Sequence, residues 1–382
     1  MMSGIEIRPV ATARERHTFL TFPWAIYRGD PLWVPPLLAE RAKTIDPRRG
    51  AFFLRGEAEF FIAWRDGRPV GTICAAEDRV TNAQRGKRDC MFGFFECIED
   101  EAVAFAMFDH AARWGRARNL DYLYGPWNLD YEDSYGVLLE GRDRPPVLLC
   151  GHTPPYYQRM HEAYGFVPAR GDNLAYEIQL HHDTPALQLI ARLAERMRRR
   201  GTITIRHADL ALWEEEIDRL LPLLNEALAH LPDFIPWQRE ALRATLGAFR
   251  QIADPELILF AEVKGRVVGW FPAVPNINEA LIHANGLRYP WDFARLAWHM
   301  RRRPKCAAIK SGLVLPEYWD TGVSVLLFDE MARRLNAKGY TWADLSLTSD
   351  DNPYAPHLIE RAGATVYKRY RVYRKSILLA SS

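Results

Sequence analysis

Residues 307–335, AAIKSGLVLPEYWDTGVSVLLFDEMARRL, combine the parts of an anion-binding site. The small and apolar residues at 307–315 predict a strand that is buried on both faces. Pro316 ends that strand, and Asp320-Thr321-Gly322 has the chemistry of a turn and a helix start. Because the first backbone N–H groups of a helix have no partner within it, this order predicts a phosphate site. The helix itself is predicted by apolar residues at helical spacing, Leu326, Leu327, Met331 and Leu335.

The same order of strand, turn and helix resembles the acyl-coenzyme-A-binding motif of the GNAT acyltransferase superfamily. In that motif a splayed strand presents backbone groups to the acyl thioester, and a Gln/Arg-x-x-Gly-x-Gly/Ala loop wraps the pyrophosphate. The loop pattern falls on residues 319–324, where Gly322 matches, Ser324 is a small substitute and Trp319 replaces the cationic or amide residue. An ordinary buried strand and helix without a ligand is the alternative. The cofactor-binding residues that the resemblance implies are Leu313, Val314, Leu315, Gly322, Val323 and Ser324.

A further part of the resemblance concerns the proton donor. Asn352, which the resemblance adds to the cofactor-binding residues, stands where the superfamily often has an asparagine near the pantetheine arm. The tyrosine that commonly protonates the departing thiolate comes seven positions later, where this chain has Ile359. The comparable position in the first half of the chain is His161. The standard proton donor is therefore absent from its usual place.

Acylation of an amine, which the resemblance implies, needs an uncharged amine, a polarised thioester carbonyl and a route for the amine proton. A carboxylate or a histidine could accept that proton, directly or through water, and a tyrosine could donate one. Each such residue is more often structural, for example in a turn or in packing at a helix start. The catalytic candidates are Glu96, Asp133, Glu140, His152, Tyr156 and His283, with Tyr157 as a second possible donor.

Two predicted β-hairpins with related sequences indicate an internal repeat. Residues 60–64 and 70–75 flank one turn, residues 257–263 and 267–271 flank another, and both hairpins contain Gly-Arg-x-Val-Gly. Each hairpin is followed by a pattern of strand, helix, strand, helix and strand. The order is that of a GNAT domain. The predicted fold class is therefore α/β (α+β), with two tandem GNAT-like domains, each a mixed, mostly antiparallel sheet flanked by helices.

The predicted organisation has four parts. Residues 1–57 form an aromatic and proline-rich lead-in packed on the first domain, which spans residues 58–182. Residues 183–201 form a linker helix, and residues 202–382 form the second domain. In the first domain Glu99, Asp100 and Glu101 stand where a pyrophosphate would need donors, and these carboxylates would repel it. We therefore expect the first domain to be degenerate and to line the acceptor side of a cleft, and the second domain to bind acyl-CoA.

Several short motifs look like signatures of one bacterial subfamily of tandem GNAT proteins. Some members of that subfamily are described as acyltransferases that make bacterial sphingolipids, the ceramide synthases. The resemblance thus implies a long-chain acyl-CoA and a sphingoid-base-like lipid amine as the substrate class. The motifs lie at residues 125–128, 140–146, 153–157, 350–353 and 367–373.

Composition limits the kinds of partner and cofactor that the chain is expected to bind. The chain of 382 residues suits two domains, and its net charge of +2 argues against a general nucleic-acid binder. The five cysteines are scattered without Cys-x-x-Cys spacing, so neither a zinc site nor a disulfide framework is predicted. The sequence shows no signal segment and no apolar run long enough to span a bilayer. We expect a cytoplasmic protein without a bound metal.

Residues 289–305, YPWDFARLAWHMRRRPK, bear on the substrate. Drawn as a helix, this segment has Asp292, Arg295 and His299 on one face and mostly apolar residues elsewhere. A broad apolar face with aromatic residues and a basic end is typical of a helix that lies on an anionic membrane or grips a lipid. A core helix with one wet stripe is the alternative. A peripheral position at the inner membrane is thus a second expectation for localisation.

The sequence leaves several functions open. The leading hypothesis is an acyl-CoA-dependent N-acyltransferase that acts on a lipid amine, with acyl carrier protein as an alternative donor that the basic clusters would dock. A non-catalytic binding or scaffold protein on a decayed acyltransferase fold is a second hypothesis, favoured by the missing tyrosine and the altered loop. An N-acetyltransferase of a small amine is another. Transfer from a charged tRNA is weakened by the small net charge.

Overall fold

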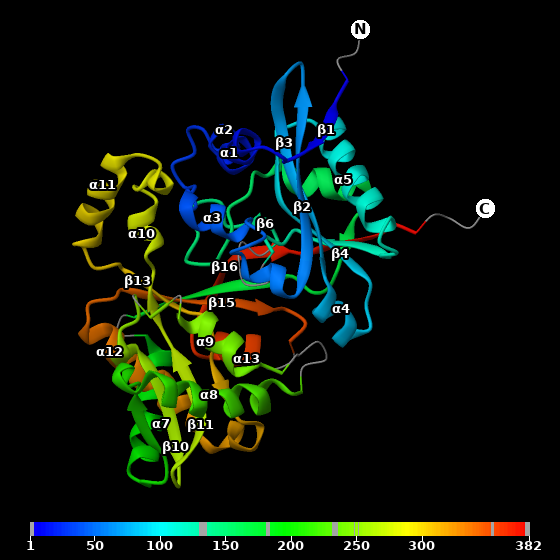
Figure 1. The fold of residues 1–382 in the computed structure, drawn as a ribbon. Coiled ribbons are helices and arrows are strands. Elements are labelled where there is room, and N and C mark those ends of the chain that lie inside the picture. Colours follow the sequence, from blue (N-terminus) through cyan, green and yellow to red (C-terminus); the bar gives the residue numbers. More distant parts are fainter. Residues whose placement is uncertain are drawn as a thin grey trace. The chain divides into compact units, whose positions relative to one another are not determined.

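The computed structural model describes residues 4–129, 136–180, 184–230, 236–247, 249–250, 252–352 and 355–378. The chain forms two compact units, shown in Figure 1. The first unit contains Met1–Asn173, Asn278–Arg301 and Lys368–Ser382. The second unit contains Leu174–Ile277 and Arg302–Tyr367.

The first unit is built on a seven-stranded sheet with the strand order β1-β2-β3-β4-β5-β17-β7. Only the β4–β5 pair is parallel among the pairs described in this sheet. The strands are β1 (Glu6–Pro9), β2 (Gly56–Arg65), β3 (Arg68–Asp78), β4 (Asp89–Cys97), β5 (Tyr122–Gly125), β7 (Val167–Pro168) and β17 (Tyr373–Ser376).

In the first unit the helix α5 packs on this sheet because its apolar stripe faces the sheet. Helix α5 buries Val103, Met107 and Phe108 against β3 and β4. The helices are α1 (Ala13–Thr21), α2 (Pro23–Ile26), α3 (Leu38–Thr44), η1 (Ala51–Leu54), α4 (Arg79–Arg85), α5 (Glu101–Arg116), α6 (Tyr156–Tyr164), α10 (Asn278–Leu281), η4 (Asn285–Leu287) and α11 (Pro290–Met300).

The second unit holds a four-stranded sheet with the order β14-β11-β10-β9. It also holds the run β12-β13-β15-β8-β16 of another sheet, up to Tyr367, while the last residues of β16 pair with β6 (Val137–Glu140) in the first unit. The strands are β8 (Asn173–Gln179), β9 (Thr204–His207), β10 (Ile258–Val263), β11 (Arg266–Pro272), β12 (Val274–Pro275), β13 (Cys306–Ile309), β14 (Leu313–Val314), β15 (Trp342–Ser349) and β16 (Thr365–Arg371).

The helices of the second unit share one apolar core with these strands. Leu327, Met331 and Leu335 of α12 are buried in it, as the helical spacing predicts. The helices are α7 (Pro185–Arg198), η2 (Leu210–Leu212), α8 (Trp213–Leu228), α9 (Arg239–Gly247), η3 (Pro255–Leu257), η5 (Pro316–Thr321), α12 (Val323–Ala337) and α13 (Ala355–Arg361).

Both predicted hairpins are confirmed, as β2–β3 and β10–β11. The single strand predicted at residues 307–315 is wrong, because the segment forms two short strands, β13 and β14, separated at residues 310–312. β12 pairs with β13, and β11 pairs with β14. Of these two short strands, only β13 pairs with β15. The break lies at the point where the segment separates from β15. The hydropathy of the sequence alone does not reveal that point.

The two units differ from the predicted domain boundaries in several places, and residues 174–182, predicted in the first domain, belong to the second unit. Residues 278–301 and the strand β17 belong to the first unit, although the sequence analysis placed both in the second domain. β17 pairs with β5 and β7, and Figure 1 shows this C-terminal segment in red among the cyan strands of that unit. Tyr373 and Ile377 are buried in the core of the first unit, so burial of the C-terminal residues fixes this assignment.

Candidate active site

In the second unit two neighbouring strands separate, and this place is called the fork. Lys310, Ser346 and β14 lie at the fork. β13 and β15 run in parallel as far as the Ile309–Leu345 pair, so Lys310 and Ser346 are the first residues beyond it. β14 pairs with β11 instead. The chain thus has the splayed strand that the sequence motif implies.

In the predicted cofactor strand, only some of the backbone amides face away from β11 at this fork. The Leu315 amide donates to the Val268 carbonyl at 2.9 Å, and Leu313 pairs with Trp270. Because alternate residues of a strand present their amides to opposite edges, the Val314 amide faces the other edge. Val314 is therefore the member of the predicted set Leu313, Val314 and Leu315 whose amide faces away from β11.

The turn after β14 leads into an uncapped helix N-terminus. Gly322 has a φ of 91°, a left-handed conformation that favours glycine, and α12 starts at Val323. In the described part of the chain no side chain caps this helix. The first-turn amides, including those of Val323 and Ser324, point out of the helix end and are the groups that suit an anion.

Two neighbouring side chains shape this turn. The Trp319 indole donates to the Val314 carbonyl at 2.9 Å, which closes the turn where the GNAT motif has a cationic or amide residue. Met197 of α7 packs on Gly322, and a Cβ at Gly322 would lie 2.2 Å from the Met197 sulfur. The backbone conformation thus favours glycine here, and the Met197 side chain would have to move to admit any other residue.

A polar network that the sequence analysis missed lies at the fork. Lys310 Nζ lies 3.0 Å from Asp344 Oδ1 and 2.6 Å from Ser346 Oγ, and the Tyr367 hydroxyl donates to Asp344 Oδ2 at 2.6 Å. Asp344 is fully buried, and Ser346 and Tyr367 are nearly so. A buried carboxylate is costly unless it is paired and hydrogen-bonded, and this one is both. The signal in the sequence was a lysine within the otherwise small and apolar stretch 307–315 and an aspartate in the strand that follows α12.

Asn352 and Ile359 have structural surroundings. The Asn352 side chain accepts from the Ala355 amide at 3.0 Å and thereby caps α13. Ile359 packs against the apolar core of the second unit, so this position offers no proton donor. Tyr367, eight residues further along, supplies a buried hydroxyl at the fork instead.

In the first unit, four of the predicted residues meet around the end of β4. The Tyr157 hydroxyl donates to Glu96 at 2.7 Å and accepts from the Cys97 amide at 2.8 Å. The Tyr156 hydroxyl donates to the Cys97 carbonyl at 2.8 Å. Tyr27, which the sequence analysis did not select, lies 3.5 Å from Glu96 and donates to the His152 carbonyl at 2.9 Å.

His152 forms a pair with Asp30, a second residue that the sequence analysis missed. His152 Nε2 lies 2.8 Å from Asp30 Oδ2, and the His152 side chain is only 5% exposed. Its Nδ1 is buried and has no hydrogen-bond partner among the described residues. With the proton on Nε2, directed at Asp30, Nδ1 carries a free lone pair, which is the state of a general base.

Burial shifts the pKa values of the side chains in this cluster. It raises the pKa of Glu96 to about 7, against hydrogen bonds from Tyr157 and Tyr27 that lower it. Burial lowers the pKa of His152, and the hydrogen bond to Asp30 opposes that change. Burial also raises the pKa values of Tyr156 and Tyr157, so both hydroxyls keep their protons near neutrality.

The remaining candidates lie outside this cluster. Glu140 is exposed on β6, 3.6 Å from Arg369. His283 stacks on His299 with ring centroids 3.8 Å apart, in the segment that carries α11. Asp133 lies outside the described residues. His161 is a core residue among aromatic rings, where burial lowers its pKa to about 4.

The helix after β4 differs from α12 at its N-terminus. Asp100 caps α5 by accepting from the Ala102 amide at 2.9 Å, whereas Gly322 caps α12 without a side chain. Arg65 lies 2.8 Å from Asp100 and lowers its pKa, so the carboxylate stays charged. A charged carboxylate on these amides occupies the position that a phosphate would need.

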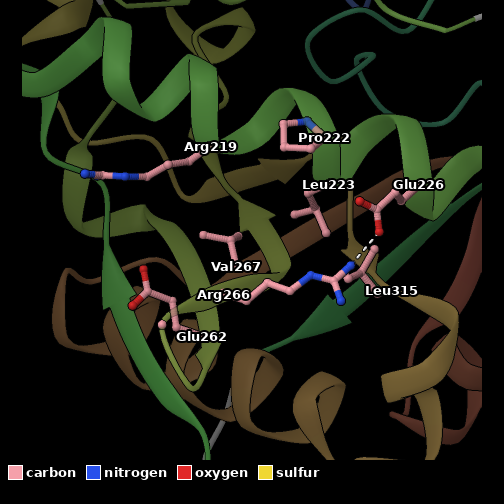
Figure 2. Close-up of a pocket in the computed structure, with 9 residues that line it drawn as sticks. Arg219, Pro222, Leu223, Glu226, Glu262, Arg266, Val267 and Leu315 are labelled. Carbon is pink, nitrogen blue, oxygen red and sulfur yellow. Dashed lines mark hydrogen bonds and ion pairs between the residues drawn. The ribbon is translucent and has the colours of Figure 1, made fainter.

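Figure 2 shows a pocket of the second unit that borders the predicted cofactor strand. It has a volume of about 240 Å³ and lies between α8 and the β10–β11 hairpin, next to Leu315. Its charged side chains are paired, since Arg266 lies 2.5 Å from Glu226 and 3.2 Å from Glu317. These pairs favour a structural role for the rim of this pocket.

The described residues contain no group of three or more His, Cys, Asp or Glu side chains that could hold a metal ion. None of their helices is both long and apolar enough to cross a bilayer. All five cysteines are buried, and none of these described residues forms a disulfide.

Comparison with known proteins identifies the class. A solved tandem GNAT protein from the clavulanic acid biosynthesis pathway is 12% identical and shares the fold with a TM-score of 0.59, over 99% of this chain and 100% of that one. The sequence profile of the acetyltransferase (GNAT) family matches residues 220–364. The chain belongs to the GNAT superfamily in its tandem-domain form, and it is an acyltransferase.

Two relatives match over nearly the whole chain. The bacterial ceramide synthase of Caulobacter vibrioides is 31% identical, over 98% of this chain and 98% of that protein. Protein YghO of Escherichia coli is 28% identical, over 97% of this chain and 95% of that protein. The predicted superfamily and tandem fold are thereby confirmed.

Proposed function

We propose that this protein is an acyl-CoA-dependent N-acyltransferase whose substrates are a long-chain acyl-CoA and a sphingoid-base-like lipid amine. The observation that carries this proposal is the end-to-end match to a protein named bacterial ceramide synthase. The cofactor site that we propose is the fork and the turn of the second unit, with Val314, Gly322, Val323 and Ser324. The cap that Asp100 places on α5 supports a first unit without a cofactor.

In the proposed reaction the amine nitrogen attacks the thioester carbonyl carbon and forms a C–N bond. The C–S bond then breaks, and coenzyme A leaves as a thiolate that takes up one proton. The nitrogen loses one proton to a base, so protons and charge balance. The amide that faces the fork, Val314, would polarise the carbonyl by donating to its oxygen.

Two groups are candidates for roles in the reaction, one in each unit. Lys310, with Asp344 and Ser346, places a cation at the fork, where it would stabilise the departing thiolate. His152, held by Asp30, has the unpartnered nitrogen that a base needs. Glu96, Tyr156 and Tyr157 stay in the proposal as the hydrogen-bonded surroundings of this base.

The proposal is tested by binding and by product formation. We expect palmitoyl-CoA to raise the melting temperature more than acetyl-CoA or free coenzyme A, because a ligand that binds only the folded state stabilises it. Mass spectrometry of an amine panel that includes sphingoid bases then identifies the acceptor. Palmitoyl-acyl carrier protein, offered in a parallel reaction, tests the other donor.

A matched pair of variants tests whether the pyrophosphate of acyl-CoA binds at the start of α12. Ser324→Asp places a charge in the first turn of α12, where it favours the helix but repels a pyrophosphate, whereas Ser324→Asn is similar in shape and neutral. We expect Ser324→Asp to weaken acyl-CoA binding about tenfold relative to Ser324→Asn, without loss of melting temperature. Equal binding by both variants would contradict the proposed cofactor site.

A small-amine N-acetyltransferase and a scaffold protein are the alternatives. A melting temperature that rises with acetyl-CoA as much as with palmitoyl-CoA would favour the first. No change with any thioester would favour the second, for which the departures at Trp319 and Ile359 are the supporting observations.

A further inference from the structure

The helix α11 has an unusual orientation on the first unit, because its polar side faces inward. Asp292 is fully buried and accepts from the Tyr289 amide at 3.0 Å, which caps the helix. His299 lies on the same side and stacks on His283. The sequence analysis considered a core helix with one wet stripe, and the structure shows the opposite arrangement.

The outward side of α11 is apolar and aromatic. Trp291, Phe293 and Trp298 are 57%, 58% and 59% exposed, and Met300 is also exposed. At 100° per residue these side chains, with Ala294 and Ala297, cover the half of the helix opposite Asp292 and His299. Exposed apolar patches rimmed by polar residues mark interaction sites.

This segment is fixed to the first unit rather than loosely attached. The Trp24 indole donates to Asn285 at 2.7 Å, and Gly286, with a φ of 69°, packs against Trp24 and Pro36. The guanidinium of Arg288 lies 4.7 Å from the Trp24 ring centre. The aromatic lead-in therefore holds the helix with its apolar side outward. Figure 1 shows α10 and α11, in yellow, near the blue helices of the lead-in.

Arginines flank the apolar side of α11. Arg288 precedes the helix, Arg295 lies at its edge, 62% exposed and 3.8 Å from Asp292, and Arg301 follows it. The only carboxylate between residues 288 and 303 is Asp292, which is buried. A two-fold contact with a second copy would bring these arginines together, whereas an anionic surface would pair with them.

We propose that α11 docks the first unit on an anionic lipid bilayer, lying in the interface with its aromatic side in the headgroup and acyl boundary. Tryptophan and phenylalanine partition into that zone, and each nearby arginine contributes about 1 kcal/mol on an anionic membrane. A helix of 11 residues lies on a bilayer and does not cross it. The proposal gives a lipid substrate a route to the enzyme, but vesicle binding is measured without any substrate and so fails or succeeds independently of the proposed function.

The test is flotation of the full-length protein with two kinds of vesicle, phosphatidylcholine alone and equal parts of phosphatidylcholine and phosphatidylglycerol. We expect binding to the anionic vesicles, several-fold weaker binding to the neutral ones, and at least about a tenfold loss for Trp291→Ala/Trp298→Ala. Leu54→Ala/Val167→Ala removes exposed apolar side chains elsewhere on the same unit and should bind as the parent does. Melting temperatures of all variants check folding.

Three results would overturn the proposal. They are the absence of binding to anionic vesicles, binding that the double tryptophan variant retains, and a concentration-dependent dimer in analytical ultracentrifugation that this variant abolishes. The last result would identify the apolar side as a contact between copies. Arg295→Glu adds a charge test, and we expect it to reduce binding to anionic vesicles more than to neutral ones.

Discussion

Individual residues in the first unit combine burial with unusual titration. Glu96 and His152 come from different elements, and the Tyr27 hydroxyl contacts both of these residues. Glu96 is held by Tyr157, and His152 by Asp30. At this scale the chemistry depends on partners that are far away in the sequence.

Asp30 should act on the reaction through the orientation of His152. In Asp30→Asn the hydrogen bond that raises the pKa of His152 loses its charge, so that pKa falls further and the acid limb of the kcat/KM profile moves to lower pH. We also expect kcat to fall about tenfold or more, because the imidazole loses its preferred tautomer. The measurement is a pH–rate profile with palmitoyl-CoA, with Asp46→Asn as a surface control. An unchanged profile would remove His152 from the mechanism.

Glu96 should make stability depend on pH. Its pKa is raised in the folded state to about 7, so between its ordinary value of 4.5 and that pKa the folded protein holds a proton that the unfolded chain has lost. The resulting stabilisation is present below pH 4.5 and is lost as pH rises to 7, by at most about 3 kcal/mol. Glu96→Gln removes this dependence, so it should exceed the parent in stability at pH 8 and match it more closely at pH 5. Urea unfolding at both pH values measures the free energy of unfolding. An equal change of that free energy with pH in the two proteins would contradict the prediction.

At the scale of elements, the β14–η5–α12 segment decides where an anion could bind. Its helix lacks a side-chain cap, whereas α5 is capped by Asp100. The sequence predicted this contrast from glycine and carboxylate positions. It could not predict that Met197 packs on the turn, because that contact depends on how α7 lies against α12.

Alanine variants of two glycines that flank α12 separate the cost of backbone strain from the cost of side-chain packing. Gly322 and Gly339 have φ values of 91° and 83°, but a Cβ at Gly339 meets nothing within 4 Å. We expect Gly339→Ala to cost about 1 kcal/mol, from the backbone alone, and Gly322→Ala to cost about 1–2 kcal/mol, because the flexible end of the Met197 side chain must also move to admit the new methyl group. Urea unfolding gives both values. A Met197→Ala background should bring the two costs together, and equal costs without it would refute the packing account.

At the scale of the whole molecule, the chain order and the units do not coincide. β8 follows the first unit in sequence but lies in a sheet of the second, and β17 ends the chain but lies in a sheet of the first. The two predicted halves therefore cannot be separated by a single cut in the chain.

Removal of β17 should destabilise the first unit selectively. A chain ended after Val372 loses Tyr373 and Ile377 from the core and the strand that pairs with β5 and β7. We expect faster hydrogen exchange at β5 and α6 and a fall of several kcal/mol in stability. A chain ended after Leu378 keeps this strand and serves as the control. Faster exchange confined to α12 and β15 would contradict the assignment.

The sequence alone determined the tandem fold, both hairpins and the helix start at Gly322, and it supplied Glu96, His152, Tyr156 and Tyr157 as separate candidates. These features follow from local periodicity, turn chemistry and residue type, which act over short stretches of chain. The tertiary structure decided the rest: the partner Asp30, the network of Lys310, Asp344 and Tyr367, and the unit that receives β17. It also placed Asp292 of α11 inside, where the Tyr289 amide and the Asn285 side chain donate to it, and left the aromatic side chains of that helix exposed. Long-range pairing and the satisfaction of buried polar groups set these outcomes, and both depend on contacts between distant segments of the chain.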